Sequence, residues 1–464
     1  MAGSFAAVDL LVLGLYAAAL AGVAVVRGRR RGADDAASYL AAGRAVTLPG
    51  FVMNLVATWY GGVLGVGEYS YRYGAANWVV FGVPYYVTAV LFAFFIAPRA
   101  RRTRALTIPD QLRSAYGERT GMLGAVVLFA MTLPGAYLLM AGTIAAEVVP
   151  VPRLVAVVAI VILSSAYLFF GGMRAIVTVD RIYFVLMYAG FALMVGHLWS
   201  HFGGLGFLRS KLDPVLFTWN GGQSAQAILV WYVIALAALV EPSFYESVFA
   251  ARDARTARNG ILISVLFWAV FDFMTTTTGL YARALLPNLA DPTRAFPLLA
   301  ESVLPPLVKG LFFVGMLATV MSTVDSYLFI AAQTLGHDLL ARWRRAPRRD
   351  NRWTRIGLVV ACAGSVAVAA SGLSIVQVWH HLGSIGTPAL LVPLVASFEP
   401  RLRMRPPAAF LSMAGAAAIA ALWIATAQQG VYWGGLEPIF PALGFALLVW
   451  TVDFVGRRGA RRVG

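Results

Sequence analysis

The sequence predicts an all-α integral membrane protein with about thirteen transmembrane helices in one polytopic domain, residues 1–464. Its composition is the first reason, because 60% of the residues are hydrophobic and only 12% are charged, as in chains that cross a membrane many times. The second reason is that thirteen segments are apolar and long enough to cross a bilayer, which takes about 20 residues. The third is that the charges of the intervening loops alternate in step with this number of crossings.

The expected spans follow one another with short polar connections. The first contains Asp9, has no basic segment before it and is followed by Arg27, which indicates a retained span and not a cleaved signal peptide. The connection 98–120 contains Pro109, which predicts a short helix starting after this proline. The expected spans are 8–26, 51–73, 78–97, 121–147, 153–170, 182–202, 225–248, 260–282, 308–335, 355–371, 374–397, 407–428 and 436–455.

The basic residues predict the orientation. With the N-terminus outside, 30 of the 37 Lys and Arg residues fall on the cytoplasmic side, as expected for loops that are retained inside. We therefore expect a multi-pass protein of the plasma (inner) membrane with its N-terminus outside and its C-terminus in the cytoplasm. The net charge of +16 is then explained by loops that face anionic lipid, so the expected partner is the lipid bilayer and not nucleic acid.

The second expected span contains a cluster of glycines. Gly61, Gly62, Gly65 and Gly67 are followed by the carboxylate of Glu68. Each glycine costs about 1 kcal/mol relative to alanine inside a helix. Irregular backbone at membrane depth is tolerated only where it is buried in protein or lines a wet cavity. The cluster predicts the broken helix of a transporter, whose free carbonyls hold an ion; the alternative is glycine-mediated packing of two unbroken helices.

A second break is expected where Pro242 follows Glu241. Proline removes a backbone donor and clashes with the preceding turn. Two interrupted spans, each opening a block of five, predict an inverted repeat with blocks 51–202 and 225–397. One extra helix at 8–26 precedes the repeat and two at 407–455 follow it. The alternative for Glu241-Pro242 is a simple kink.

A stripe of hydroxyl groups lies on the expected span 308–335. Thr319, Ser322, Thr323 and Ser326 have the spacing i, i+3, i+4 and i+7, which places them on one face of a helix, and Asp325 lies beside them. Hydroxyl, carbonyl and carboxylate oxygens are hard ligands, and a set with few full charges suits a monovalent cation. The alternative is helix packing in which each hydroxyl bonds to the previous turn.

The sequence lacks the residues that other classes of function require. Cys362 is the only cysteine, so no intramolecular disulfide is possible, and no Cys/His set has metal-site spacing. We find no nucleophile–base pair and no phosphate-binding loop, so we expect no enzyme activity. The sequence stops about nine residues after the last span, which argues against a sensor with a cytoplasmic signalling domain. No feature indicates an obligate protein partner.

Five stretches match the motifs of one family in order. They are YLAAGR at Tyr39–Arg44, ATWYGGVLGVGEYSYRYG at Ala57–Gly74, GGMRAIVTVD at Gly171–Asp180, FAARDARTARNG at Phe249–Gly260, and MSTVDS at Met321–Ser326 followed by Gly336–Leu339. On these stretches the chain resembles the sodium:solute symporter family, which includes proline, pantothenate and sugar cotransporters. The matches extend over about 40–345, and the residues after about 355 match only as hydrophobic spans.

The resemblance implies an inverted-repeat fold of the LeuT type with an extra N-terminal helix. It also implies sodium-driven uptake of a small organic solute by alternating access, with the sodium ion as the only cofactor. The main sodium site would use carbonyls of Val56, Trp59 and Thr319 and the side chains of Ser322 and Thr323. In some members a second ion lies lower, and the matching residues here are Asp180, Asp325 and Ser326, which suit a cation or a proton.

The identity of the solute does not carry over from the family. The second break has Glu241-Pro242 and Glu246-Ser247 where many members have Gln and a Gln-Arg pair, and Glu68 and Glu241 favour a solute with an amino or other cationic group. The alternatives are a proton-coupled transporter or a related LeuT-fold amino-acid permease and, less favoured, a transporter-like solute sensor. The residues expected at the solute are Gly61, Gly62, Glu68, Tyr137, Glu241 and Phe244.

Overall fold

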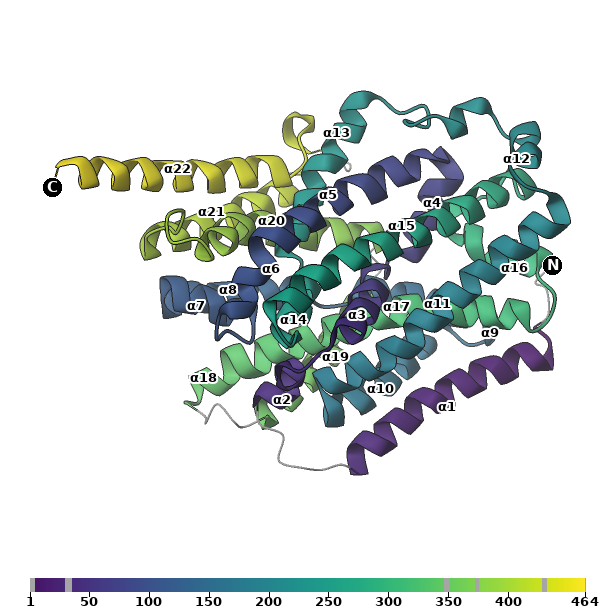
Figure 1. Cartoon of the computed structure of the whole chain (residues 1–464), viewed down its shortest axis with the longest axis horizontal. Helices are drawn as coiled ribbons and strands as arrows, with labels where there is room; N and C mark the ends of the chain where they lie inside the picture. Colours follow the sequence, from purple (N-terminus) through teal and green to yellow (C-terminus); the bar gives the residue numbers. More distant parts are fainter. Residues whose placement is uncertain (1–4, 30–35, 346–350, 372–374, 428–431, 464) are drawn as a thin grey trace.

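The structure, a computed structural model, describes residues 5–29, 36–345, 351–371, 375–427 and 432–463. In these ranges it is built from helices, and its only strand-like pairing is an isolated bridge between Val46 and Ala251. The prediction of an all-α protein is confirmed. The long helices lie roughly along the longest axis of the molecule (Figure 1).

The helices of the first half of the chain are short around the first break and long afterwards. They are α1 (Ala7–Arg29), α2 (Ala36–Ala41), α3 (Leu48–Trp59), α4 (Val63–Tyr73), α5 (Val83–Leu91), α6 (Ala97–Arg102), α7 (Ile108–Tyr116), α8 (Glu118–Met131), α9 (Gly135–Val148), α10 (Arg153–Gly171), α11 (Met173–Phe202) and α12 (Leu205–Lys211). The 3-10 or π segments η1 (Ala42–Arg44), η2 (Trp78–Gly82), η3 (Phe92–Ile96) and η4 (Pro214–Phe217) connect or continue them.

The second half repeats this mixture of short and long helices. They are α13 (Ala225–Ile234), α14 (Pro242–Ala250), α15 (Ala254–Leu285), α16 (Ala295–Val303), α17 (Val308–Gln333), α18 (Ala341–Trp343), α19 (Arg352–Ala370), α20 (Ile375–Ser397), α21 (Pro406–Ala425) and α22 (Ile439–Val463). The 3-10 or π segments here are η5 (Ala235–Val240), η6 (Pro292–Arg294), η7 (Thr334–Leu340) and η8 (Trp433–Gly435).

Eleven of the described helical stretches are long and apolar enough to cross a membrane by themselves. A twelfth span is formed by α3 and α4, which pass the same test only together. α20 covers the remaining expected span, but its described apolar part, His381–Ser397, is shorter than a full crossing. The expected ends at residues 374 and 428 lie outside the described residues. The count of thirteen, the domain limits and the inverted repeat therefore stay predictions.

The two ends of the helical body differ in charge. Helices α2, α6, α7 and α18 lie toward the end of the long axis at which α22 finishes, whereas α12, α16 and the start of α1 lie toward the opposite end (Figure 1). The first end carries Arg99, Arg101 and Arg102 on α6 and Arg342 on α18, and we call it the arginine-rich end. This gathering agrees with the alternation of loop charges from which the orientation was predicted.

The second expected span is broken, as predicted. α3 ends at Trp59, α4 begins at Val63, and the chain bends by 61° between them. Gly61 and Gly62 lie in this break, whereas the other two glycines of the cluster lie inside α4. The break is therefore narrower than the glycine cluster that predicted it.

The chain breaks a second time at Glu241. The preceding helix tightens into η5, and Glu241 leaves the helical region with φ −60° and ψ 116° before α14 begins at Pro242. Proline has no N–H to offer the preceding turn. The Glu241 carboxylate instead caps α14, because it accepts hydrogen bonds from the Ser243 hydroxyl at 3.1 Å and the Ser243 N–H at 3.5 Å.

Another expected helix is interrupted where continuity was predicted. The range 121–147 is divided into α8, which ends at Met131, and α9, which begins at Gly135. The reason is Pro134, which cannot donate to the helical ladder, and Thr132 closes α8 by donating its hydroxyl to the Leu128 carbonyl at 2.7 Å. The two parts still form a single stretch long enough to cross the membrane.

The short helix predicted after Pro109 is confirmed, but it begins at Ile108, one residue before the proline. It is α7, with Pro109 in its first turn. Thr107 caps it, because its hydroxyl oxygen accepts a hydrogen bond from the Asp110 N–H at 3.2 Å. This helix lies at the arginine-rich end, between the spans formed by α5–α6 and α8–α9.

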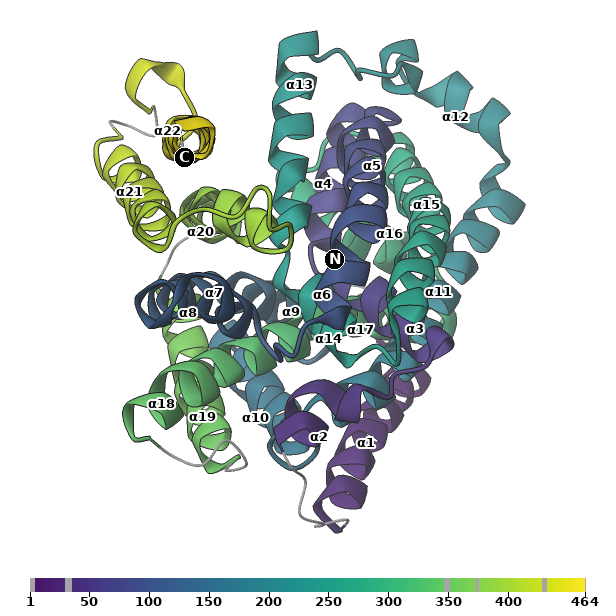
Figure 2. The same ribbon diagram turned by 60° about the vertical axis from the view of Figure 1, so that its left-hand side comes forward.

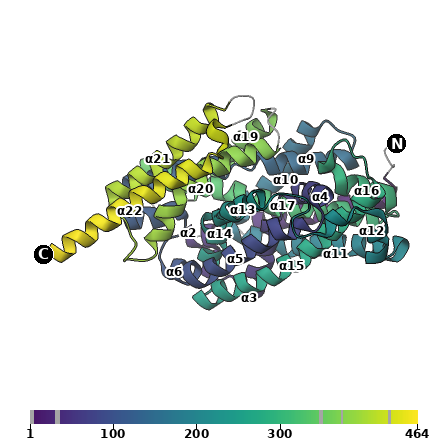
Figure 3. The same cartoon turned by 90° about the horizontal axis from the view of Figure 1, so that it is seen from above.

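Of the described spans, the one that contains α17 is the most deeply buried. In its most apolar stretch, 94% of the residues are buried inside the protein, whereas the corresponding share for α1 is 17%. α17 packs on α11, α3, α9, α19 and α1. Figure 2 shows α17 among these helices, whereas α20, α21 and α22 gather on one side of the body and α22 extends beyond it (Figure 3). Polar groups on α17 therefore face other helices and not lipid.

A buried carboxylate joins α1 to the start of α17. Asp9 Oδ1 accepts hydrogen bonds from the N–H groups of Leu307 and Gly310, both at 2.9 Å. The first N–H groups of a helix have no partner within it. Asp9 thus caps α17 from a different helix and fixes the position of the span that carries the hydroxyl stripe.

We expect Asp9→Ala to lower the free energy of unfolding by about 1–3 kcal/mol, because the N–H groups of Ala6, Leu307 and Gly310 lose their acceptor. The measurement is thermal unfolding of the purified protein in detergent. Asp213→Ala is the matched control, because Asp213 caps η4 at an exposed site. Equal losses in the two variants would show that Asp9 has no special role in holding α17.

Candidate ion and solute site

The break after α3 lies directly against α17. The hydroxyl of Thr323 donates a hydrogen bond to the carbonyl of Thr58 at 2.5 Å, one residue before α3 ends. Gly61 lies in the tightest part of this contact, because a Cβ at this residue would lie 2.3 Å from Thr323 Oγ1. The end of α3 approaches α17 this closely only because residue 61 has no side chain.

A buried polar network extends this contact toward α11. Ser322 donates to Asp180 Oδ1 at 2.6 Å, and Asn54 donates to Asp180 Oδ2 at 2.5 Å. Thr58 Oγ1 lies 3.2 Å from both Ser322 Oγ and Ser326 Oγ. All five side chains are buried. The result is a set of hard oxygen atoms on α3, α11 and α17 that includes one carboxylate.

Asp325 belongs to a different network. Ser164 and Tyr167 of α10 donate hydrogen bonds to its carboxylate, and Tyr183 of α11 donates at 3.3 Å. Ser326, the next residue, instead faces α3. Of the three residues expected to form a second site, Asp325 is thus separated from the others.

The two breaks meet through aromatic rings. The ring of Trp59, at the end of α3, lies 5.2 Å from that of Phe244 on α14. Both pack on Trp268 of α15, at 5.2 and 5.7 Å between centroids. We call Trp59, Phe244 and Trp268 the aromatic cluster. Rings of this kind commonly wall the binding sites of small molecules, because they are large and rigid.

The carboxylates expected at the solute lie in two separate places. Glu241, at the second break, accepts a hydrogen bond from the Tyr327 hydroxyl at 2.7 Å, and the Tyr327 ring packs 5.4 Å from that of Tyr137. Glu68 does not join them, because it pairs with Arg72 on its own helix at 2.9 Å and is partly exposed. Glu241 and Tyr137 are thus brought together, and Glu68 is not.

α3 and α14 contribute partners to this network that were not predicted from the sequence. Asn54 and Thr58 lie one helical turn apart ahead of the break, and Ser247 of α14 donates to Asn54 Oδ1 at 3.0 Å. Small polar residues at i and i+4 on an apolar helix were a readable signal. Their role was not visible, because their partners on α11 and α17 lie 126 to 268 residues away along the chain.

A comparison with known protein families identifies the relatives of this chain. The family model described as "Sodium:solute symporter family" matches residues 39–396. The chain belongs to the sodium:solute symporter family. This symporter is therefore a sodium-coupled transporter of a small solute and not an enzyme, and the prediction of family and function class is confirmed.

Relatives of this symporter are named for different solutes. The chain is 24% identical over 472 residues to the sodium/pantothenate symporter of Escherichia coli (strain K12), covering 96% of this chain and 95% of the relative. It is 25% identical over 284 residues to the osmoregulated proline transporter of Bacillus subtilis (strain 168), covering 57% of each. The relatives agree on small organic solutes and differ on which one.

A solved structure of a Na+-coupled sialic acid symporter, in a substrate-bound outward-open state, has a similar fold. The TM-score is 0.79 at 15% sequence identity, and the match covers 97% of both chains. At this identity the likeness concerns the fold alone. It confirms the all-helical fold class, whereas the inverted repeat that the resemblance implied stays a prediction.

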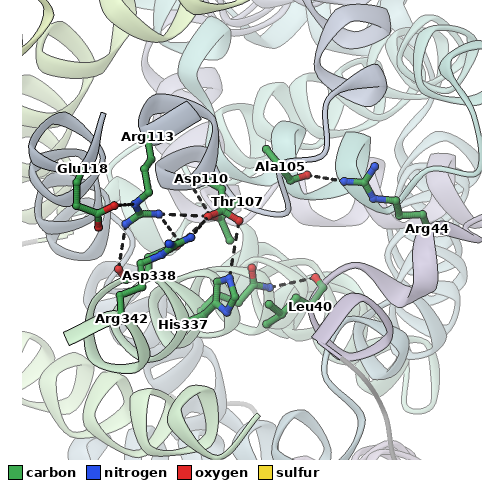
Figure 4. A network of polar contacts seen from close by, with 11 residues as sticks. Leu40, Arg44, Ala105, Thr107, Asp110, Arg113, Glu118, His337, Asp338 and Arg342 are labelled. Atoms are coloured by element: carbon green, nitrogen blue, oxygen red, sulfur yellow. Dashed lines mark hydrogen bonds and ion pairs between the residues drawn. The ribbon is translucent and has the colours of Figure 1, made fainter. Parts of the chain in front are cut away.

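At the arginine-rich end the symporter carries a network of ion pairs between α7, η7 and α18 (Figure 4). Asp110 pairs with Arg342 at 2.7 Å and with Arg113 at 3.2 Å, and His337 Nε2 lies 3.8 Å from it. Burial raises the pKa of Asp110, but the nearby His337 and the charges of Arg342 and Arg113 outweigh it and hold the pKa well below its usual range. Asp110 therefore stays charged and ties α7 to the end of the α17 span.

This network also contains three groups with the spacing of a metal site. Asp110, His337 and Asp338 each offer a ligand atom, and these atoms lie within 4.8 Å of one another. Both carboxylates already have an arginine as an ion-pair partner, since Arg342 pairs with Asp110 at 2.7 Å and Arg113 lies 3.8 Å from Asp338. A metal cation would have to displace these charges, so we interpret the cluster as an ion-pair network.

Proposed function

We propose that this symporter imports a small organic solute with sodium by alternating access, and that the coupling ion binds where α3 breaks against α17. The observation that supports this is the 2.5 Å hydrogen bond from Thr323 to the Thr58 carbonyl, which brings hydroxyl groups of α17 to the end of α3. A set of oxygens with few full charges suits a hard monovalent cation that must leave again. The proposed ligands are the carbonyls of Val56, Trp59 and Thr319 and the side chains of Ser322 and Thr323.

The position of Trp59 explains how the ion and the solute would be coupled. Its carbonyl is a proposed sodium ligand, and its ring packs on Phe244 in the aromatic cluster, 5.2 Å away. Sodium bound at the end of α3 would therefore order the wall of the solute site. Coupling further requires that sodium binds the outward-open state more tightly than the inward-open state, because an ion with equal affinity for both shifts nothing.

Asp180, Asp325 and Ser326 are proposed to hold a second cation or a proton. The hydrogen bond from Ser322 to Asp180, at 2.6 Å, supports a cation that shares Ser322 with the first site. Asp325 is fully buried, which favours a proton at that carboxyl, whereas the three hydroxyl groups that donate to it favour its charged form. Within this proposal the two aspartates therefore have different roles.

The solute is proposed to bind between the two breaks, beside the aromatic cluster. Glu241 is the carboxylate at the second break and so favours a solute with an amino or other cationic group. An amino acid satisfies this requirement, and a relative of this chain is a proline transporter. The residues proposed to contact the solute are Gly61, Gly62, Tyr137, Glu241 and Phe244, whereas Glu68, also expected there from the sequence, pairs with Arg72 apart from them.

The proposed location is the plasma membrane, with the N-terminus outside and the arginine-rich end in the cytoplasm. The gathering of α2, α6, α7 and α18 at one end supports this orientation through the positive-inside rule.

We expect the transported solute to stabilise the purified protein only when sodium is present. A ligand at 100 times its Kd raises the free energy of unfolding by about 2.7 kcal/mol. The measurement is thermal unfolding with a panel of amino acids, quaternary amines, carboxylates, sugars and vitamins. Potassium in place of sodium is the control, at several pH values. Equal stabilisation in both salts would contradict sodium coupling, and stabilisation that follows pH and not sodium would favour the proton-coupled alternative.

A further inference from the structure

A buried carboxylate on α14 has little to compensate its charge. The Glu246 side chain belongs to a residue that is 7% exposed. Among the described residues its one hydrogen bond comes from Gln333 Nε2, 3.3 Å from Oε1, and none of their ion pairs includes it. An ionised carboxylate buried without a cation costs several kcal/mol. Glu246 is therefore stable in this position with a cation or a proton close to it.

Glu246 lines a small cavity between α14, α17 and the start of α7. Its volume is about 20 Å³, which is enough for one water molecule or one small ion. The hydroxyl of Thr107 donates to Asp338 at 2.9 Å, and that of Thr334 donates to the Ile330 carbonyl at 2.7 Å. Each hydroxyl oxygen keeps at least one unused lone pair. The polar side chains in the wall of the cavity are those of Thr107, Glu246, Gln333 and Thr334.

The cavity lies between the proposed sodium site and the arginine-rich end. Gln333 follows Thr323 by ten residues on α17, which corresponds to roughly 15 Å along a helix. Ser247, adjacent to Glu246, donates to Asn54 at 3.0 Å, and Asn54 donates to Asp180 at 2.5 Å. These hydrogen bonds connect the residue next to Glu246 to the network around the sodium site, whereas the Glu246 side chain is turned by about 100° from that of Ser247 and contacts Gln333.

Gln333 makes a second contact, which connects the cavity to α2. Its Nε2 group also donates to the carbonyl of Leu40 on α2, at 3.3 Å, so one amide holds α2, α14 and α17 together (Figure 4 shows the contact at Leu40). A cation on Glu246 would repel the positive end of this amide and weaken its hydrogen bond to the carboxylate. A cation in the cavity would then weaken the contacts through which Gln333 holds α2, α14 and α17 together.

We propose that Glu246, with the hydroxyl oxygens of Thr107 and Thr334, forms a binding position for a small monovalent cation, sodium or a proton, on its path to the arginine-rich end. The site is built for this class of ligand because it offers oxygen atoms, one negative charge and room for one small guest. The proposal rests on the proposed entry of sodium at the break between α3 and α4, and it adds a second binding position between that site and the arginine-rich end.

The test compares wild-type protein with Glu246→Gln, purified at full length in detergent. Glutamine keeps the size of the side chain and still accepts the hydrogen bond from Gln333. Two quantities are measured: radioactive sodium bound per protein at saturation, and protons released on addition of sodium in weakly buffered solution. If the site takes sodium, the variant binds one ion fewer; if it takes a proton, the variant binds as much sodium but exchanges fewer protons. Unchanged values of both would overturn the proposal.

Two further variants keep the outcome interpretable. Glu399→Gln is the matched control, because Glu399 is a partly exposed carboxylate whose pair with Arg99 is 3.5 Å long, and we expect no change in either quantity. Ser322→Ala reports on the proposed main site in the same assay. Normal sodium binding in Ser322→Ala would count against that site alone, whereas normal sodium and proton values in Glu246→Gln would count against the cavity alone.

Discussion

Ser322→Ala and Thr323→Ala are each expected to raise the sodium concentration that half-saturates uptake by about tenfold to hundredfold. Each change removes one proposed side-chain ligand of the ion, and the loss of a hard oxygen ligand or of a bond to a charged group costs roughly 1.5–3 kcal/mol, where 1.4 kcal/mol is tenfold. In Ser322→Ala the hydrogen bond of 2.6 Å to Asp180 is lost as well. The measurement is solute uptake into proteoliposomes as a function of sodium, normalised to protein level.

Ser365→Ala is the matched control for these variants. Ser365 is also fully buried in a helix, but its hydroxyl donates to the carbonyl of Ala361 in the preceding turn, at 2.6 Å on α19. We expect its sodium dependence to match that of the wild type. If Ser322→Ala and Thr323→Ala also keep the wild-type sodium dependence, the ion does not bind at the hydroxyl stripe.

Gly61→Ala is expected to abolish transport while leaving the protein folded in the membrane. The new Cβ would lie 2.3 Å from Thr323 Oγ1, so the end of α3 must move away from α17. Overpacking of this kind costs roughly 1–3 kcal/mol, which a large membrane domain tolerates. The displaced carbonyls could no longer share an ion with Thr323, so both uptake and sodium-dependent thermal stabilisation should be lost.

The control for this substitution is Gly14→Ala on α1. Nothing lies within 4 Å of the position that its Cβ would take, so uptake should be unchanged. Surface expression and the monodispersity of the purified protein are compared for both variants. Uptake by Gly61→Ala at the wild-type rate would mean that the close approach of α3 and α17 is not needed at any step of transport.

Most of the helical architecture was predictable because a bilayer acts on each segment separately. A span must be apolar over a fixed length, and the backbone must satisfy its own hydrogen bonds within it. Local chemistry also located both breaks, since Gly61-Gly62 and Pro242 weaken the helix where they stand. It did not locate the interruption at Pro134, although the residue is as visible as Pro242, because the apolar pattern continues across it.

The polar networks were predictable only in part. The hydroxyl stripe on α17 follows from helical spacing, and the structure brings Ser322, Thr323 and Ser326 to the end of α3. The same spacing grouped Asp325 with them, but successive residues of a helix are turned by about 100°. Asp325 therefore faces the tyrosines of α10 and α11 instead.

The sequence by itself determined the membrane class, the positions of the breaks and the family, because each depends on residues that are close together in the chain. Only the tertiary structure decided which oxygens meet. Thr58 contacts Ser326, which lies 268 residues away in the sequence, and Gln333 contacts Leu40, which lies 293 residues away. The distance between such groups depends on how closely the helices pack, and at the decisive contact that is set by the missing side chain of Gly61 against Thr323.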